Sequence, residues 1–186
     1  MQQLPTSRSA IVAPGGGYGA DGPLLMYARL AVQSRGGHVH PIAWKLSRDP
    51  DVSQQRRRVA SQVESAVEKM TAATGAAPLI IGKSLGSLAA PVVADLGLAA
   101  VWFTPLLTDK PTVEALRQAT GPCLLVGGTA DRFWDGEAAR SLPAEVVEVD
   151  GADHGMFVAG RLAASAAVLG QVITAVEDFL DNAVWP

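Results

Sequence analysis

The sequence predicts an α/β fold, a three-layer sandwich in which helices cover both faces of a parallel, doubly wound sheet of about six strands. Short apolar runs alternate with amphipathic stretches from end to end. This alternation calls for parallel strands joined by right-handed helical crossovers. The length of 186 residues, 48% of them hydrophobic, suits one domain with one sizeable core. No repeat, charge block or low-complexity linker divides the chain, so we expect a single domain over residues 1–186.

Six short apolar runs are the expected strands. They are Ser9–Ala13, His38–Trp44, Pro78–Ile81, Ala99–Phe103, Cys123–Val126 and Glu145–Val149. In doubly wound sheets, sites form at the carboxyl ends of the strands. The loops after strands one, three, four, five and six are therefore expected to share one edge of the sheet.

The amphipathic stretches between these runs are the expected helices. They cover Pro23–Ser34, about Val52–Ala73, Leu85–Leu96, about Thr112–Ala119, Gly136–Leu142 and about Ala163–Asn182. Asp21 can cap the first helix, Pro23 suits its first turn, and Gly36-Gly37 ends it. Pro91 should kink or restart the helix in which it lies.

Two of these helices carry apolar stripes on a period of 3.6 residues. The stripes are Val59, Val63, Val67 and Met70 in the second helix, and Leu169, Ile173, Val176 and Leu180 in the last. Such stripes mark the helix face that packs against the sheet.

Composition excludes several classes of protein. The net charge of −3 and the pI near 5.6 give no electrostatic reason to expect nucleic acid or anionic lipid as a partner. The longest apolar stretch seen, around Leu98–Leu107, is far shorter than the ~20 residues of a membrane span, and the N-terminus does not resemble a signal peptide. The single cysteine, Cys123, excludes an internal disulfide. We expect a cytoplasmic protein.

A nucleophile is predicted in the segment Gly82–Gly86, which reads G-x-S-x-G between an apolar strand and a helix. In a tight strand-to-helix turn, glycines two positions either side of Ser84 relieve crowding against the backbone of the serine. The turn raises the hydroxyl above the sheet, and the N–H of Leu85 points to where an oxyanion would form. The alternative is an ordinary βα turn in which Ser84 caps the helix.

The same segment also ends like a phosphate-binding loop, because Gly82 is followed by lysine and serine. That motif needs a glycine five positions before Gly82, where this chain has Ala77, and loop residues where it has an apolar strand. The sequence therefore argues against nucleotide binding here.

The expected base is His154. A serine hydroxyl needs a base to take its proton, and histidine is the usual one. His38 and His40 lie at the amino end of strand two, on the opposite edge; they could form a metal pair, but no third ligand is evident, so we interpret them as surface residues. His154 follows strand six and so lies on the site edge. We predict no metal site.

The expected acid is Asp131, which would fix the tautomer of the histidine and stabilise its cation. Asp131 follows strand five in GTAD, although it could instead be a turn or cap residue. Asp135 is the next candidate, and Asp153 the third because a sequence neighbour of His154 is poorly placed to reach its ring. The order along the chain is then Ser84, Asp131, His154, each after a different strand.

The glycine-rich loop after strand one allows two interpretations. Gly17, Gly19 and Gly22 satisfy G-x-G-x-x-G, but a dinucleotide fold needs an acidic residue at the end of strand two, which reads Ala-Trp-Lys over residues 43–45. A loop beside the nucleophile strand can instead supply a second oxyanion N–H. We favour Gly16 and then Gly17 for that role; the alternative is a mobile turn.

With PGGGYG, GKSLG, GTAD and GADHG in that order, the sequence resembles the α/β-hydrolases, of the small lidless kind that includes dienelactone-hydrolase-like and esterase-like members. The resemblance runs from Ser9 to about Leu180. It implies a Ser84–His154–Asp131 triad and an oxyanion hole formed by the N–H groups of Leu85 and of Gly16 or Gly17. It also implies a sheet of spatial order 2-1-3-4-5-6, and the short segment 104–121 leaves no room for a cap domain.

The activity expected from this site is hydrolysis of small or medium carboxylic esters through an acyl-enzyme on Ser84, with no metal or organic cofactor. Aromatic and sulfur-containing side chains in or beside the site-edge loops could line an apolar pocket, although alternate strand residues must point into the core. They are Tyr18, Trp102, Phe103, Phe133, Trp134 and Met156. A thioesterase, amidase or acyltransferase on the same fold, or a catalytically idle interaction module, remains open.

Overall fold

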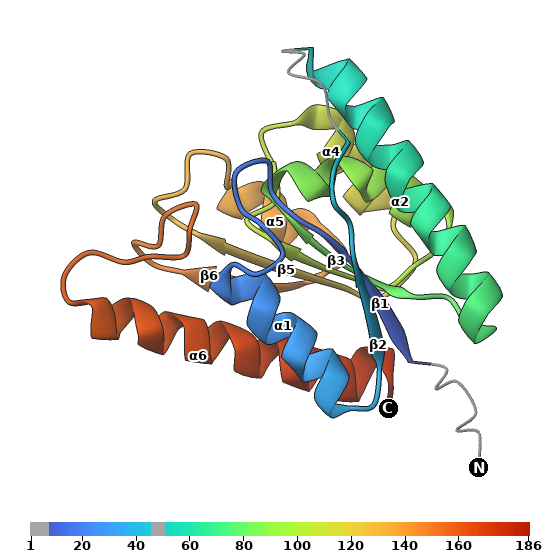
Figure 1. The fold of residues 1–186 in the computed structure, drawn as a ribbon. Coiled ribbons are helices and arrows are strands. Elements are labelled where there is room, and N and C mark those ends of the chain that lie inside the picture. Colours follow the sequence, from blue (N-terminus) through green and yellow to red (C-terminus); the bar gives the residue numbers. More distant parts are fainter. Residues whose placement is uncertain (1–7, 46–50) are drawn as a thin grey trace.

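Six parallel strands form one sheet in the order β2-β1-β3-β4-β5-β6 (Figure 1). The computed structural model describes residues 8–45 and 51–186. The strands are β1 (Ser9–Ala13), β2 (His38–Pro41), β3 (Leu79–Lys83), β4 (Ala100–Phe103), β5 (Cys123–Gly128) and β6 (Glu145–Val149). The predicted fold class and spatial order are confirmed. Residues 1–7, on which the expectation about a signal peptide partly rests, lie outside the described residues.

Eight helical segments connect and flank the strands. They are α1 (Pro23–Ser34), α2 (Val52–Thr74), the 3₁₀ helix η1 (Ser84–Ala89), α3 (Ala90–Asp95), α4 (Lys110–Gln118), α5 (Gly136–Ser141), α6 (Leu162–Phe179) and the π-helical turn η2 (Leu180–Val184) within the described ranges. The helix predicted over residues 85–96 is thus two helices, and Pro91 lies in the first turn of the second. Proline restarts a helix there because it lacks an N–H donor.

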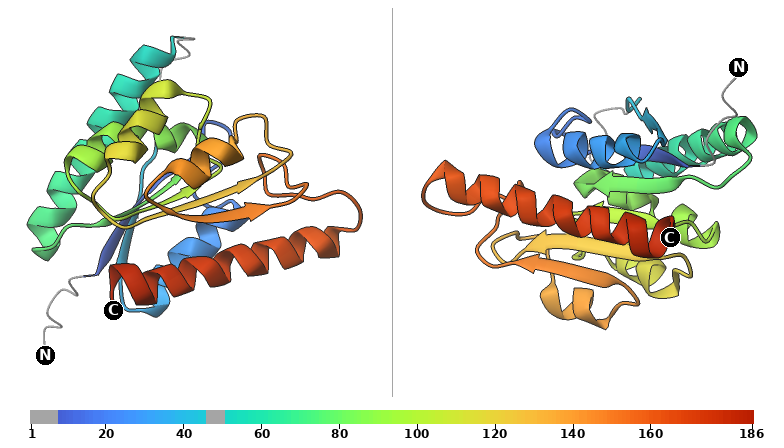
Figure 2. Two further views of the ribbon diagram at one scale, coloured as in Figure 1. Left: turned by 180° about the vertical axis from the view of Figure 1, so that it is seen from behind. Right: turned by 90° about the horizontal axis from the view of Figure 1, so that it is seen from below.

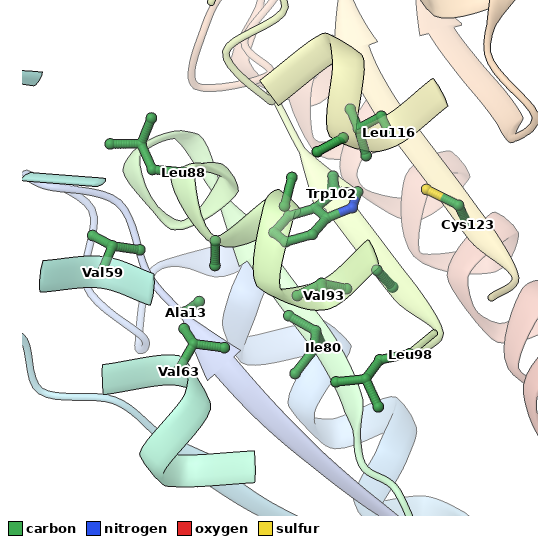
Figure 3. Close-up of a cluster of buried hydrophobic side chains, with 14 of the residues drawn as sticks. Ala13, Val59, Val63, Ile80, Leu88, Val93, Leu98, Trp102, Leu116 and Cys123 are labelled. Atoms are coloured by element: carbon green, nitrogen blue, oxygen red, sulfur yellow. The ribbon is translucent and has the colours of Figure 1, made fainter. Parts of the chain in front are cut away.

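The sheet separates two cores (Figures 1 and 2). Helices α2, α3, α4 and α5 pack on one face, where Val59, Val63 and Trp102 belong to the buried cluster (Figure 3). Helices α1 and α6 cover the other face and contact each other. Strands buried on both faces explain the continuous apolar runs in the sequence.

The predicted N-terminal cap of α1 was wrong. Asp21 does not cap α1: the N-cap is Gly22, without a side-chain hydrogen bond, and Asp21 pairs with Arg29 at 2.7 Å. The Tyr18 hydroxyl instead accepts a hydrogen bond of 2.9 Å from the N–H of Leu24, in the first turn of the helix. The sequence gives no sign of this contact, because tyrosine is not a usual capping residue.

The buried face of α6 differs by one position from the predicted stripe. Val176 and Leu180 are buried as expected, but Leu169 and Ile173 are only half-buried. The buried residues on the helix itself are Ser165, Val168, Val172, Val176 and Phe179. The helix carries two apolar stripes side by side, and packing on the sheet selects one of them.

The continuous helical segment Leu162–Val184 also corrects the sequence-based search for membrane spans. By length and composition it could cross a membrane, with a mean hydropathy of 1.3. It passes this test because it is rich in alanine and valine. One face of it packs on the sheet beside α1.

Candidate active site

Loops after three strands bring Ser84, Asp131 and His154 into one hydrogen-bonded chain. The Ser84 Oγ lies 2.8 Å from His154 Nε2, and His154 Nδ1 lies 2.7 Å from Asp131 Oδ2. A carboxylate can only accept, so the proton belongs on Nδ1, and Nε2 is free to accept from the serine hydroxyl. The structure thus joins the three side chains that were selected from the sequence.

Ser84 sits at the point where β3 becomes the helix η1. Its φ is 49°, a left-handed conformation that is uncommon for a residue with a side chain. The flanking glycines are needed, but for a reason other than the predicted one. A Cβ at Gly82 would collide with the ring of Trp102, and one at Gly86 with the carbonyl of Ala13. The crowding comes from the neighbouring strands β4 and β1, and not from the backbone of the serine itself.

Asp131 is held in a fixed orientation beside the histidine. Its side chain is fully buried, and its Oδ1 accepts a hydrogen bond of 2.9 Å from the N–H of Phe133. The two rivals have other partners: Asp135 caps α5 through a 2.9 Å bond from the N–H of Ala138. Asp153 accepts from two backbone N–H groups of the loop that carries the histidine.

The loop of His154 is a tight turn after β6. The carboxylate of Asp153 accepts hydrogen bonds of 2.8 Å from the N–H of Gly155 and 2.9 Å from the N–H of Phe157. The ring of Phe133 meets the imidazole edge-on, with centroids 5.1 Å apart. These contacts hold the imidazole in place while its side chain remains 34% exposed, so a substrate can reach it.

The glycine-rich loop lies across from Ser84. The indole N–H of Trp44 donates to the carbonyl of Pro14 at 2.9 Å, which ties the loop to the chain after β2. A Cβ on Gly16 would lie 3.6 Å from the side chain of Leu85, whereas one on Gly17 would meet nothing within 4 Å. Gly16 is therefore the glycine of this pair that lies against Leu85. Within the described part of the chain, the N–H groups of Gly16 and Gly17 donate no hydrogen bond, so both are free to bind a ligand atom.

Lys83 is a site residue that sequence reasoning missed. It is only 1% exposed, and its Nζ donates to Thr104 Oγ1 and to the backbone carbonyl of His154, both at 2.9 Å. Burial lowers the pKa of Lys83 to about 8, while the carboxylates of Asp131 and Asp153 act in the opposite direction. One signal was available: Lys83 comes two positions after the apolar run Leu79–Ile81, at the end of a buried strand.

Four of the six proposed pocket residues are buried in the core, and three of these do not line the two pockets beside Ser84, which corrects the prediction. Trp102 and Phe103 are buried on opposite faces of the sheet, because consecutive strand residues point to opposite faces. Trp134 is also buried, and its indole N–H donates to Glu148 at 2.7 Å. Phe133 contacts the imidazole, as described above.

The fourth, Met156, is buried but lines, together with Tyr18, an apolar pocket of about 230 Å³ between α1 and α6. The other lining residues are Pro23, Leu24, Gly155, Phe157, Leu162, Ser165, Ala166 and Leu169. A second pocket of about 290 Å³ contains Ser84, His154, Lys83 and the glycine loop, and both pockets share Tyr18 and Gly155. The wall from α6 was not predicted, since its small residues carry no chemical motif.

The two exposed histidines lie on β2, where His38 and His40 occupy the edge strand. Over residues 8–45 and 51–186, no group of three or more histidine, cysteine or acidic side chains is arranged to hold a metal ion.

No family model and no curated protein matches the chain, but solved structures do. A serine hydrolase without a lid from Xanthomonas campestris has a TM-score of 0.74 at 14% identity, covering 97% of this chain and 84% of that one. Est1E from Butyrivibrio proteoclasticus, with ferulic acid bound, has a TM-score of 0.75 at 12% identity, covering 99% and 92%. The esterase domain of a Rhodothermus marinus protein has a TM-score of 0.66 at 15% identity, covering 98% and 90%.

The chain therefore has the α/β-hydrolase fold. These similarities extend over almost its whole length, and the sheet order agrees with that implied by the sequence motifs. At such identities the likeness shows the fold alone, so the function is argued from the site.

Proposed function

We propose that this protein is a serine hydrolase that cleaves carboxylic esters with small or medium acyl groups. The observation that carries the proposal is the hydrogen-bonded chain from Ser84 Oγ through His154 to Asp131, with contacts of 2.8 and 2.7 Å. On this fold, such a chain at the carboxyl edge of the sheet matches the needs of acyl transfer. Esterases and serine hydrolases among the structural neighbours support it.

The reaction would run in two halves. Ser84 Oγ attacks the ester carbonyl carbon while its proton passes to Nε2 of His154, and the carbonyl π electrons move onto oxygen. The tetrahedral intermediate collapses, and the leaving alkoxide takes the proton from Nε2 and departs as the alcohol. Ser84 then carries the acyl group as an acyl-enzyme. Water then gives its proton to Nε2, attacks the acyl carbon, and the acid departs as Ser84 regains its proton.

The oxyanion would be stabilised by two backbone N–H groups. Leu85 lies at the start of η1, where the N–H groups of a helix have no partner within the helix. Gly16 faces the side chain of Leu85 from the opposite loop and lines the pocket that contains Ser84. We therefore assign the second donor to Gly16 in preference to Gly17. Donors fixed in this way stabilise the developing charge without reorganising.

The apolar pocket supports the acyl-group part of the proposal. Its volume of about 230 Å³ falls below the ~300–1,000 Å³ typical of sites for drug-sized ligands. It neighbours the pocket that contains Ser84, since Tyr18 and Gly155 line both. An apolar acyl chain of modest length can therefore lie between α1 and α6 while its carbonyl stays at the serine.

Narrowing this pocket should change the preference for acyl length. Ala166→Phe places a ring in the pocket, whereas Ala167→Phe changes an exposed residue of the same helix outside it. We expect Ala166→Phe to lower kcat/KM for p-nitrophenyl octanoate about tenfold relative to the acetate. Ala167→Phe should leave the ratio between the two esters unchanged. Equal ratios in both variants would place the acyl group elsewhere.

A fluorophosphonate probe tests the proposed chemistry directly, since it labels only a serine that an adjacent base activates. We expect one labelled peptide, containing Ser84, and no label in Ser84→Ala. Folded wild-type protein that stays unlabelled would contradict a hydrolase and favour an idle interaction module. If the label appears, a panel of esters, thioesters and amides should show the esters cleaved fastest; a preference for thioesters or amides would replace the ester assignment.

A further inference from the structure

Lys83 is a charged group where packing alone calls for an apolar one. It ends β3, it is 1% exposed, and Ile81, two positions earlier on the same face, belongs to the apolar core under α1 and α6. Burying an ammonium is costly unless its hydrogen bonds and charge are matched. Among the described residues Lys83 forms no direct salt bridge, so a methionine would be the cheaper choice at this position.

The contacts of the ammonium all lie at the candidate active site. Two N–H groups donate to Thr104 Oγ1 and to the carbonyl of His154, each at 2.9 Å. The ring of Tyr18 covers Nζ, with its centroid 4.7 Å away. The carboxylates of Asp131 and Asp153 favour the charged form from a distance, against the effect of burial. Two of the three N–H donors of Lys83 are thus bound to neighbouring groups of the protein, and the ring of Tyr18 covers the ammonium.

These contacts fix the histidine at a third point. The imidazole ring is bound at Nδ1 by Asp131 and at Nε2 by Ser84. Lys83 binds the backbone carbonyl of His154. Lys83 is also joined to Ser84 by a peptide bond. The nucleophile and the backbone of the base are therefore tied together through one side chain, across 71 positions of sequence separation.

We propose that Lys83 is a positioning residue for the proposed hydrolysis: its ammonium, directed by Thr104, ties the backbone of His154 to the strand that carries the nucleophile. This inference rests on the proposed function. Misplacing a reacting group by about 1 Å can cost two orders of magnitude in rate, so a tie of this kind acts on kcat. Lys83 contacts the ring of Tyr18, one wall of the acyl pocket, but does not itself line that pocket, so the effect on KM should be smaller than the effect on kcat.

The test compares Lys83→Met with a matched control. Lys83→Met keeps the length of the side chain and removes every donor. Arg56→Met breaks the partly buried ion pair of 2.7 Å between Arg56 on α2 and Asp109, the N-cap of α4. Neither residue lines the two pockets of the candidate site. We expect Lys83→Met to lower kcat for a p-nitrophenyl ester 10- to 100-fold with KM within twofold, and Arg56→Met to leave both within twofold. A kcat within twofold of wild type in Lys83→Met, an equal loss in both variants, or a change confined to KM would overturn the proposal.

A second measurement does not depend on turnover. The proton on Nδ1 of His154, bonded to Asp131, should give a low-field NMR signal, assigned by its loss in His154→Gln. We expect Lys83→Met to shift or broaden this signal and Arg56→Met to preserve it. An unchanged signal in Lys83→Met would show that Lys83 does not position His154. Wild-type protein that shows the signal but no probe labelling would instead reject the proposed function alone.

Thr104→Val keeps the inference testable if Lys83→Met fails to fold. The substitution conserves shape and removes one acceptor of the ammonium, while the bond to His154 remains. We expect kcat to fall two- to fivefold with KM unchanged and with the ring signal broadened. A wild-type kcat together with an unaltered signal would show that Lys83 does not position the base.

Discussion

Replacing His154 with glutamine is expected to lower kcat/KM for a p-nitrophenyl ester by about 10⁴-fold. Glutamine keeps polar atoms near Ser84 but cannot take its proton, and the hydrogen bond of 2.8 Å to Nε2 is lost. The imidazole is partly exposed and outside the core, so the thermal unfolding midpoint should change little. Steady-state kinetics and a melting curve on the same preparation measure both quantities.

His40→Gln is the matched control, because His40 is exposed on the edge strand β2. It should retain wild-type kcat/KM. A loss of less than tenfold in His154→Gln would contradict a histidine base.

Asp131→Asn is expected to lower kcat by roughly 10⁴-fold, the size of effect seen when a triad acid elsewhere becomes an amide. The Oδ2 atom that accepts from Nδ1 at 2.7 Å would be replaced by an amide, whose N–H donor favours the other tautomer of His154. That tautomer carries its proton on Nε2 and cannot accept from Ser84. Single-turnover acylation with the same ester measures the loss.

Asp135→Asn is the control for this substitution. Asp135 accepts from the N–H of Ala138 as the cap of α5, and asparagine is also a good capping residue. We expect kcat within twofold of wild type and little change in the free energy of unfolding. If Asp135→Asn lost far more activity than Asp131→Asn, the acid would have to be reassigned.

The parts of the site that could be predicted are those fixed by topology. The carboxyl ends of parallel strands share one edge, so any polar residue directly after strands three, five and six had to lie there. Ser84, Asp131 and His154 all meet that condition, which is why three residues from distant segments could be selected together. The same rule placed His38, at the amino end of strand two, at the opposite end of the strands from the site.

The parts that could not be predicted depend on side-chain direction and tertiary packing. Strands buried on both faces show no alternation, so nothing in the run AVWF tells which face receives Trp102 and which receives Phe103. The pocket wall comes from α6, whose position over the site depends on which of two adjacent apolar stripes packs on the sheet. The contact of Lys83 with the carbonyl of His154 is similarly invisible, because any residue offers a carbonyl.

Three residues with side chains adopt positive φ angles in the described part of the chain: Ser84 at 49°, Thr104 at 42° and Met156 at 64°. Ser84 and Thr104 directly follow β3 and β4, and Met156 lies in the loop after β6 that carries His154. Conformations of this kind cost of order 1–3 kcal/mol apiece and persist only where the surroundings enforce them. The protein thus gives up stability to hold Ser84 and its neighbours in a fixed arrangement. Glycine at Thr104 would ease the backbone, and Lys83 would lose its hydrogen bond to Thr104 Oγ1.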